Sequence, residues 1–310
     1  MTDPNPSPDP GTAAGTSSPL AKRLAGKARF TPYEFVFGEA GFELRTFPRI
    51  QAEAEQQGID ATHPDRFAFL TIGAEAIREV VPEDVPPETL EEYRLFLYHA
   101  YNFWCYGRRL YVLDPAATRF LVESTPDLRR WEMRLPAQSV YVQLPPNLFW
   151  ASVSPEVPPE PVDGFFVCCH EAMDGRGDTF ETLEVLMVLG IRRERAGFSL
   201  IHFGAEVVPG IAAAWSDTPA RDEGRDFESI LPGGEMAGLY SILTIPEALK
   251  LISRILWYID RHPGQVTAHA APERRTTDRP GSVPLSHLPF HCVSLHESDA
   301  GAAAEAAGDG

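Results

Sequence analysis

The sequence predicts an α+β fold in which helices pack against an antiparallel sheet of about five or six strands, with disordered N- and C-terminal tails. Two observations lead to this prediction. Between Ser139 and Val208, apolar and polar residues alternate with the period of two that is typical of strands, and most connections are too short for parallel crossovers. On both sides of this run, apolar residues recur at helical spacing behind capping signals.

The expected strands follow one another through the middle of the chain, and their alternate positions hold β-branched and aromatic residues. Turn signals separate them, because residues 174–178 contain two glycines and the charged segment 192–197 ends in glycine. The proline-rich segment 154–162 predicts a stiff arm, which is either a solvated loop or a docking arm for a partner. The expected strands are residues 139–144, 148–153, 164–171, 183–191 and 198–208.

The N-terminal half, residues 29–134, is expected to be mainly helical, and one further helix follows the strands. Two capping boxes, which begin at Thr89 and Thr244, each open a helix. Asp114 before a proline favours another short helix, because Asp is a good N-cap and Pro fits the first turn. The longer expected helices are residues 48–57, 62–80, 89–112 and 244–261.

The expected helix at 89–112 is rich in aromatic side chains and has little polar surface beyond its first turn. A helix that is apolar all round is usually buried on several sides, which predicts the central core helix. The alternative is a stacking surface for a flat ligand. A nucleobase ligand is disfavoured, because stacking platforms for nucleic acid usually lie in basic grooves and this chain carries a net negative charge. The aromatic residues are Tyr93, Phe96, Tyr98, Tyr101, Phe103, Trp104, Tyr106 and Tyr111.

Composition divides the chain into a folded centre and flexible ends. The first residues are rich in Pro, Ser and Gly and low in aromatics, which is typical of disorder. Residues 287–297 have an apolar core and either add a strand to the sheet or form a linear motif bound by another protein; we favour the strand. The expected organisation is a disordered tail at 1–28, a single α+β domain at 29–265 (helical half 29–134, sheet and C-terminal helix 139–265), a linker at 266–286 and a disordered tail at 298–310.

The chain has 310 residues, a formal net charge of −17 and a pI of about 4.9. This charge disfavours nonspecific binding to nucleic acid or to anionic membranes, both of which need a basic surface. No long uncharged apolar segment and no secretory signal are seen, so we expect no membrane span and a cytoplasmic location. The scarcity of lysine beside abundant Ala, Gly and Pro is typical of a GC-rich, bacterial genome.

No short motif in the sequence specifies a chemistry. The patterns of nucleotide-binding loops, serine hydrolases, zinc proteases and zinc deaminases are absent. The four cysteines form no CxxC pair, so a structural zinc site is unsupported and a reducing compartment fits best. Catalytic groups also assemble from distant positions, so the absence of motifs does not exclude an enzyme.

One cluster has residue types that suit catalysis, because strand register can bring two histidines from neighbouring segments together. A cysteine beside an imidazolium forms a thiolate nucleophile, and a His/Cys/Glu set also suits zinc. Against this, free cysteine is among the most buried residue types. The candidate catalytic residues are Cys168, His170, Glu171 and His202, with Cys169 and Glu206 as neighbours.

Two further clusters have looser patterns. Carboxylates around the turn at 174–178 suit Ca²⁺ or Mg²⁺, although their spacing is not that of an EF-hand loop. A histidine-rich group near the C-terminus lacks a recognised ligand spacing. The first cluster is Glu171, Asp174, Asp178 and Glu181, and the second is His287, His291, Cys292 and His296.

Three functional hypotheses follow, in decreasing order of support. The first is a non-catalytic protein-binding or assembly component of a bacterial cytoplasmic system, with a protein partner or self-association and without nucleic acid or membrane. The second is a cysteine- or metal-dependent enzyme with a site around residues 168–171 and His202. The third is a small-ligand binding module that uses the aromatic helix against the sheet. The cofactor, if the chain binds one, is not identified by the sequence.

Overall fold

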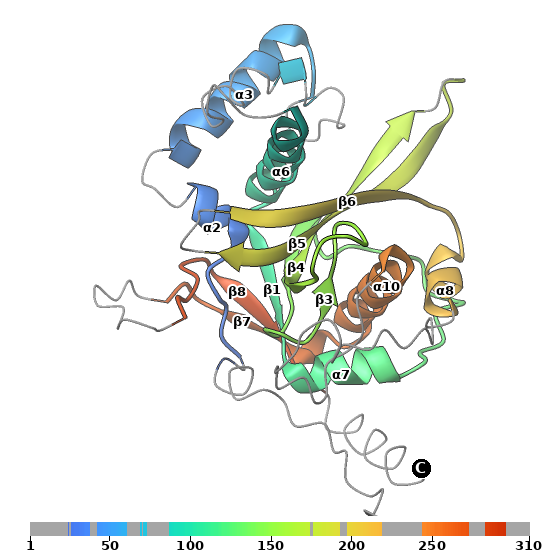
Figure 1. Cartoon of the computed structure of the whole chain (residues 1–310). Helices are drawn as coiled ribbons and strands as arrows, with labels where there is room; N and C mark the ends of the chain where they lie inside the picture. Colours follow the sequence, from blue (N-terminus) through green and yellow to red (C-terminus); the bar gives the residue numbers. More distant parts are fainter. Residues whose placement is uncertain are drawn as a thin grey trace, which may run out of the picture.

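The structure is a computed structural model that describes residues 24, 26–37, 42–60, 69, 71–72, 87–173, 176–192, 197–218, 244–272 and 283–295. Within these residues the fold is mixed α/β, with one eight-stranded open sheet between two groups of helices (Figure 1). The strands are β1 (Arg109–Leu113), β2 (Ser139–Gln143), β3 (Trp150–Ala151), β4 (Glu160–Met173), β5 (Thr179–Arg192), β6 (Gly197–Val207), β7 (Val266–His269) and β8 (Phe290–Val293). The helices are α2 (Pro32–Phe37), α3 (Phe42–Gln57), α6 (Pro87–Cys105), α7 (Pro115–Glu123), α8 (Ile211–Ser216), α10 (Ile245–Arg261) and the short 3₁₀ helix η2 (Pro263–Gln265).

The strands lie in the order β6-β5-β4-β2-β1-β8-β7, and β3 pairs with β4 outside this path. Strand β1 runs parallel to both β2 and β8, and the other neighbouring pairs are antiparallel. A sheet with helices packed against it is therefore confirmed. The prediction of a purely antiparallel sheet with five or six strands is wrong in strand number and in the direction of these two pairs.

The extra central strand comes from residues that the sequence pattern places at the end of the aromatic helix. Helix α6 ends at Cys105 because Gly107 and Arg108 both adopt left-handed backbone angles, with φ of 78° and 54°. Their N–H groups donate to the carbonyl oxygens of Trp104 and Phe103, at 3.1 and 2.8 Å, which is the Schellman pattern of helix termination. The chain then reverses into β1, and its apolar residues fill the middle of the sheet.

The described C-terminal segments also belong to the sheet. Residues 266–269 were expected to start a linker, but they form β7, which pairs with β8. Residues 290–293 form a strand, as we favoured, and it lies inside the sheet beside β1. The predicted N-terminal tail is wrong at its end, because Ala28 is buried and its carbonyl accepts from the Ser286 N–H at 3.0 Å. The rest of both predicted tails, and most of the expected helix 62–80, lie outside the described residues.

The expected helix starts at Pro48 and Thr89 are wrong, because α3 begins at Phe42 and α6 at Pro87. Two other predicted helix caps fit the described elements. The capping box at Thr244 opens α10, with the Thr244 N–H donating to Glu247 Oε2 at 2.8 Å. Asp114 caps α7 by accepting from the Ala116 N–H at 2.7 Å. In the proline-rich segment, residues 155–158 are exposed as expected of a solvated loop, whereas residues 160–162 belong to β4, where Pro161 pairs with Trp150 of β3.

Alternate residues of the long strands divide between two apolar cores. One face of the sheet packs against α7, α8 and α10, with Val167 and Val185 among its buried side chains. The opposite face packs against α2, α3 and α6, with Phe166 and Leu186 among its buried side chains. In Figure 1, α3 and α6 lie on one side of the sheet, and α7, α8 and α10 lie on the other.

Helix α6 is a core helix. Tyr98, Tyr101 and Phe103 are buried in contact with the sheet and the other helices of that face, and the Phe103 ring lies 5.5 Å from the Phe166 ring of β4. Its buried aromatic surface holds the N-terminal layer to the sheet. Of the helices in the described part of the chain, none is long and apolar enough to cross a membrane.

A buried polar network fixes the N-terminal segment to the sheet. The Arg29 guanidinium contacts the Asp163 carboxylate and donates to the Leu144 carbonyl at 2.9 Å. Asp163 also accepts from Tyr141 Oη at 2.5 Å and from Gln143 Nε2 at 3.3 Å. Burial, followed by the Asp163 charge, raises the pKa of Tyr141 well above its ordinary value. The network satisfies polar groups that would otherwise be costly to bury.

A second buried cation joins the three helices of the opposite face. Arg254 of α10 is 2% exposed and donates to the carbonyl oxygens of Leu121, Val122 and Ser216, at 3.0, 2.9 and 3.3 Å. These carbonyls lie at the C-terminal ends of α7 and α8, where helices leave acceptors without intrahelical donors. Arg254 therefore fixes α7 and α8 against α10.

Candidate functional site

Strands β4 and β5 form a long hairpin whose turn end extends away from the helices (Figure 1). The two strands remain paired from Val162–Leu189 near the body to Met173–Thr179 beside the turn. At the base of this extension lies an open pocket of about 620 Å³. We call it the hairpin pocket; it lies between the hairpin, the end of β6 and the segment 133–138. Its lining residues are Met133, Arg134, Leu135, Gln138, Cys169, His170, Glu171, Thr179, Phe180, Glu181 and Val207.

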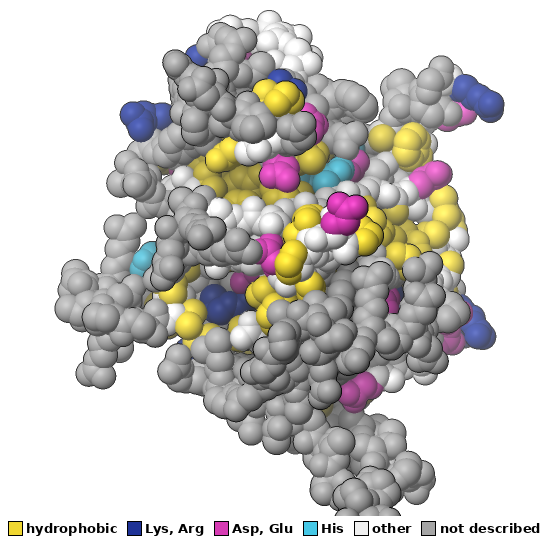
Figure 2. All heavy atoms as spheres, viewed as in Figure 1, with side chains coloured by type: hydrophobic (Ala, Val, Ile, Leu, Met, Phe, Trp, Pro, Cys, Tyr) yellow, Lys and Arg dark blue, Asp and Glu magenta, His cyan; other side chains and the backbone are white. Residues whose placement is uncertain are grey.

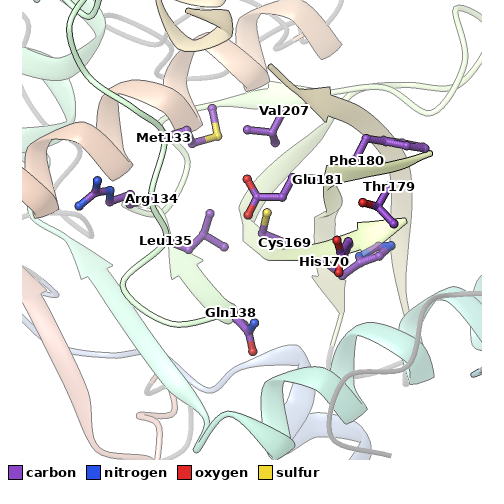
Figure 3. A pocket seen from close by; sticks show the side chains of 11 residues that line it. Met133, Arg134, Leu135, Gln138, Cys169, His170, Thr179, Phe180, Glu181 and Val207 are labelled. Atoms are coloured by element: carbon purple, nitrogen blue, oxygen red, sulfur yellow. The ribbon is translucent and has the colours of Figure 1, made fainter. Parts of the chain in front are cut away.

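The hairpin pocket combines apolar walls with acidic groups. In Figure 3 the side chains of Met133, Leu135 and Val207 face Cys169 and Glu181 across the hollow. The Arg134 side chain points away from the hollow in the same view. Its guanidinium instead donates to the Glu132 carboxylate at 3.2 Å on the surface.

Two carboxylates of the pocket lie directly opposite each other. Glu171 of β4 and Glu181 of β5 are register partners, so both side chains project from the same face of the hairpin. Both are exposed, and no ion pair of the described residues involves either of them. Like charges in this cross-strand arrangement repel, and the pocket is locally acidic.

Cys169 lines the pocket beside these carboxylates. Burial and then the negative charge of Glu181 raise the pKa of the Cys169 thiol to about 11. The thiol therefore stays protonated near neutral pH, and only the thiolate is a strong nucleophile.

Cys168, which we proposed as the nucleophile, faces the opposite side of the sheet. It is 1% exposed, and its Sγ lies 3.8 Å from both Tyr98 Oη and His99 Nδ1 of α6. Burial raises the pKa of this thiol well above its ordinary value. Cys168 is an interior side chain rather than an accessible thiolate.

The two proposed histidines lie in different surroundings. His170 is largely buried, its Nδ1 lies 3.3 Å from Tyr98 Oη, and it lines the hairpin pocket. His202 of β6 is a register partner of Leu186, whereas the partner of His170 on β5 is Thr182. The two histidines are therefore offset along β5 and are not direct neighbours across the sheet.

His202 has a carboxylate partner that sequence analysis missed. Its Nε2 lies 2.8 Å from Glu184 Oε2, and its ring lies 5.6 Å from the His99 ring of α6. Gly204 leaves room for this carboxylate, because an added Cβ would lie 3.1 Å from Glu184 Oε2. Glu184 lies on the same face of β5 as Leu186, the register partner of His202. The alternation of side chains along this strand was therefore a signal in the sequence that Glu184 shares a face with His202. Tyr98 and His99 had no such signal, since they come from a distant helix.

The structure therefore divides the proposed site into two parts. Glu171 borders the hairpin pocket, whereas the side chains of Cys168, His170 and His202 lie in the layer between α6 and the sheet, and His170 also belongs to the pocket lining. Within the part of the chain that the structure describes, no group of three or more His, Cys, Asp or Glu side chains is arranged to hold a metal ion. Asp174 and His296, which belong to the looser clusters, lie outside the described residues.

Comparisons with known proteins add little to this geometry. No protein-family model matches the chain, and no curated protein matches it significantly. One similar solved structure is described as the crystal structure of AcrVA2. It is 10% identical in sequence, with a TM-score of 0.47 over 90% of this chain and 87% of the other. A similarity of this size does not indicate a shared function.

Proposed function

We propose that the chain is a non-catalytic protein-binding or assembly component. The observation that carries this proposal is the hairpin pocket, an open hollow at the base of an extended hairpin with apolar walls and two acidic side chains. Protein interfaces typically combine apolar contact area with a polar rim. An extended two-stranded ribbon is also an accessible element for a partner chain.

The surface chemistry supports the same proposal. Figure 2 shows acidic and hydrophobic side chains next to each other over the middle of one face, while most Lys and Arg side chains lie toward its margin. With a formal net charge of −17, the chain favours partners that carry positive charge.

The arrangement of thiols and imidazoles gives little support to catalysis. A nucleophilic cysteine needs access and a lowered pKa. Cys168 is buried, and the pKa of Cys169 is raised to about 11. His202 contacts Glu184, away from the pocket.

A second candidate is a cysteine-dependent enzyme, and one observation favours it. Cys169, Glu171 and Glu181 line the same pocket, so a thiol and two carboxylates border one hollow, and the adjacent His170 directs its ring toward Tyr98 of α6. In this case the nucleophile is Cys169 rather than Cys168, and a bound substrate must lower the pKa of its thiol. The ligand-module hypothesis lacks comparable support, because Tyr98 and Tyr101 are buried in the core and neither lines the hairpin pocket.

The test is affinity purification of the full tagged chain from its native host, combined with light scattering of the eluted complex. We expect a stoichiometric partner or a defined oligomer, recovered equally well with Cys169→Ser. A monomer without any partner, together with an activity that Cys169→Ser abolishes, would establish the enzyme and refute our proposal.

A further inference from the structure

We infer that the hairpin pocket binds a single arginine or lysine side chain presented by a segment of the partner protein. The inference rests on the proposed protein-binding function and specifies the chemistry of the contact. Three features of the pocket carry it: the opposed carboxylates, the apolar walls and the orientation of Arg134, the basic residue of the pocket lining.

The opposed carboxylates provide a negative site that no ion pair among the described residues compensates. Glu171 and Glu181 are register partners on neighbouring strands, and both are exposed to a bound molecule. A cation placed between them forms charge-assisted hydrogen bonds with both and removes their mutual repulsion. A neutral or acidic partner group leaves that repulsion in place.

The apolar walls suit the aliphatic part of a long basic side chain. Met133, Leu135 and Val207 face the hollow in front of Glu181 (Figure 3). Lys and Arg bury their methylene stems along apolar surface while their charged ends reach a polar group. A pocket with apolar sides and carboxylates at one end matches both parts of such a side chain.

The chain's own arginine in the wall does not fill this role. Arg134 is 3.2 Å from Glu132, both side chains are largely exposed, and in Figure 3 it points away from the hollow. A divalent metal ion is a poorer occupant than a basic side chain, because no metal-binding group of three acidic, His or Cys side chains forms among the described residues.

The experiment selects random dodecapeptides displayed on phage against the immobilised full-length chain. Three forms of the protein are compared: the wild type, the pocket variant Glu171→Gln/Glu181→Gln, and the control variant Glu156→Gln/Glu206→Gln. The control removes two exposed carboxylates that do not line the pocket, so all effects of net charge are matched. The best selected peptide is then titrated with its basic residue intact and replaced by norleucine.

We expect the peptides selected by the wild type and by the control to share a basic residue. Its replacement, or the pocket variant, should weaken binding about tenfold or more, the size expected for loss of one charge-assisted contact. Spermine at equal concentration should compete poorly, since it lacks the peptide's flanking contacts.

Three results of the peptide selection and titration would overturn the inference. They are selected peptides without a basic residue, equal binding to the pocket variant, and no selected peptide at all. Complete displacement by equimolar spermine would also overturn it, because the ligand is then a free polyamine rather than a partner side chain. If affinity purification recovers a partner equally well with the wild type and with the pocket variant, only this inference is refuted. If neither form of the protein recovers a partner, the proposed protein-binding function itself is refuted.

Discussion

The substitution Arg29→Met tests whether the buried ion pair with Asp163 fixes the N-terminal segment to the sheet. The two side chains are only 11% and 9% exposed. Removing one partner of a buried pair usually costs about 3–5 kcal/mol, because the other charge remains buried. Tyr141 and Gln143 still donate to Asp163 in this variant, so we expect the lower end of that range, about 3 kcal/mol.

Urea denaturation followed by tryptophan fluorescence at neutral pH measures the loss. Hydrogen exchange should also quicken in residues 26–37 and in the segment 283–290, because the Arg29 region pairs with Leu285. Asp163→Asn and the double variant complete a cycle, in which we expect a coupling energy above about 1 kcal/mol.

The matched control is Arg94→Met, which breaks an exposed pair with Glu91 on α6. These side chains are 42% and 53% exposed, so the loss should stay below about 0.5 kcal/mol. A loss under about 1 kcal/mol for Arg29→Met, or strict additivity in the cycle, would refute the reasoning about the buried pair.

Three other predictions concern the helices, the sheet and the pocket. Arg254→Met should destabilise the fold by about 3 kcal/mol or more in thermal denaturation. Arg254→Lys should restore only part of the lost stability, because an ammonium lacks the planar array of donors of a guanidinium. A stability loss near zero for Arg254→Met contradicts this role of Arg254. Gly164→Ala should lower the free energy of unfolding in urea by about 3 kcal/mol or more, because the added Cβ would lie 2.2 Å from a carbonyl oxygen of β2. In the control Gly264→Ala, the added Cβ meets nothing within 4 Å, so the loss of stability should be far smaller. The rate at which iodoacetamide alkylates Cys169, measured by mass spectrometry, should rise with pH up to about pH 11. Glu181→Gln should raise this rate at pH 8, because loss of the negative charge lowers the pKa of the Cys169 thiol. An unchanged rate contradicts the placement of Glu181 beside the thiol.

Local signals in the sequence predicted several elements because their causes are local. The alternation in residues 139–143 and 197–207 requires only neighbouring residues to show which positions share a face, and β2 and β6 formed there. The caps at Asp114 and Thr244 act within three residues of the helix start, and both formed.

Strand β1 was not predictable in the same way. A short apolar run such as 110–113 fits a buried helix or a buried strand equally well. The left-handed angles at Gly107 and Arg108 end the helix, but Arg108 carries no residue-type signal for such an angle. The parallel pairing of β1 with β2 and β8 joins segments far apart in the chain, which local patterns do not encode.

For the candidate site, alternation along β4 determined that Cys168 and Cys169 point to opposite faces. The packing of α6 over Cys168 closes one face of β4, and the segment 133–138 beside Cys169 forms part of a pocket on the other face. The sequence alone thus determined the order of the residues along each strand, because the period of a strand is fixed by its backbone. Only the tertiary structure determined which of them meet, because accessibility, thiol pKa and the opposition of Glu171 and Glu181 depend on elements that approach from distant parts of the chain.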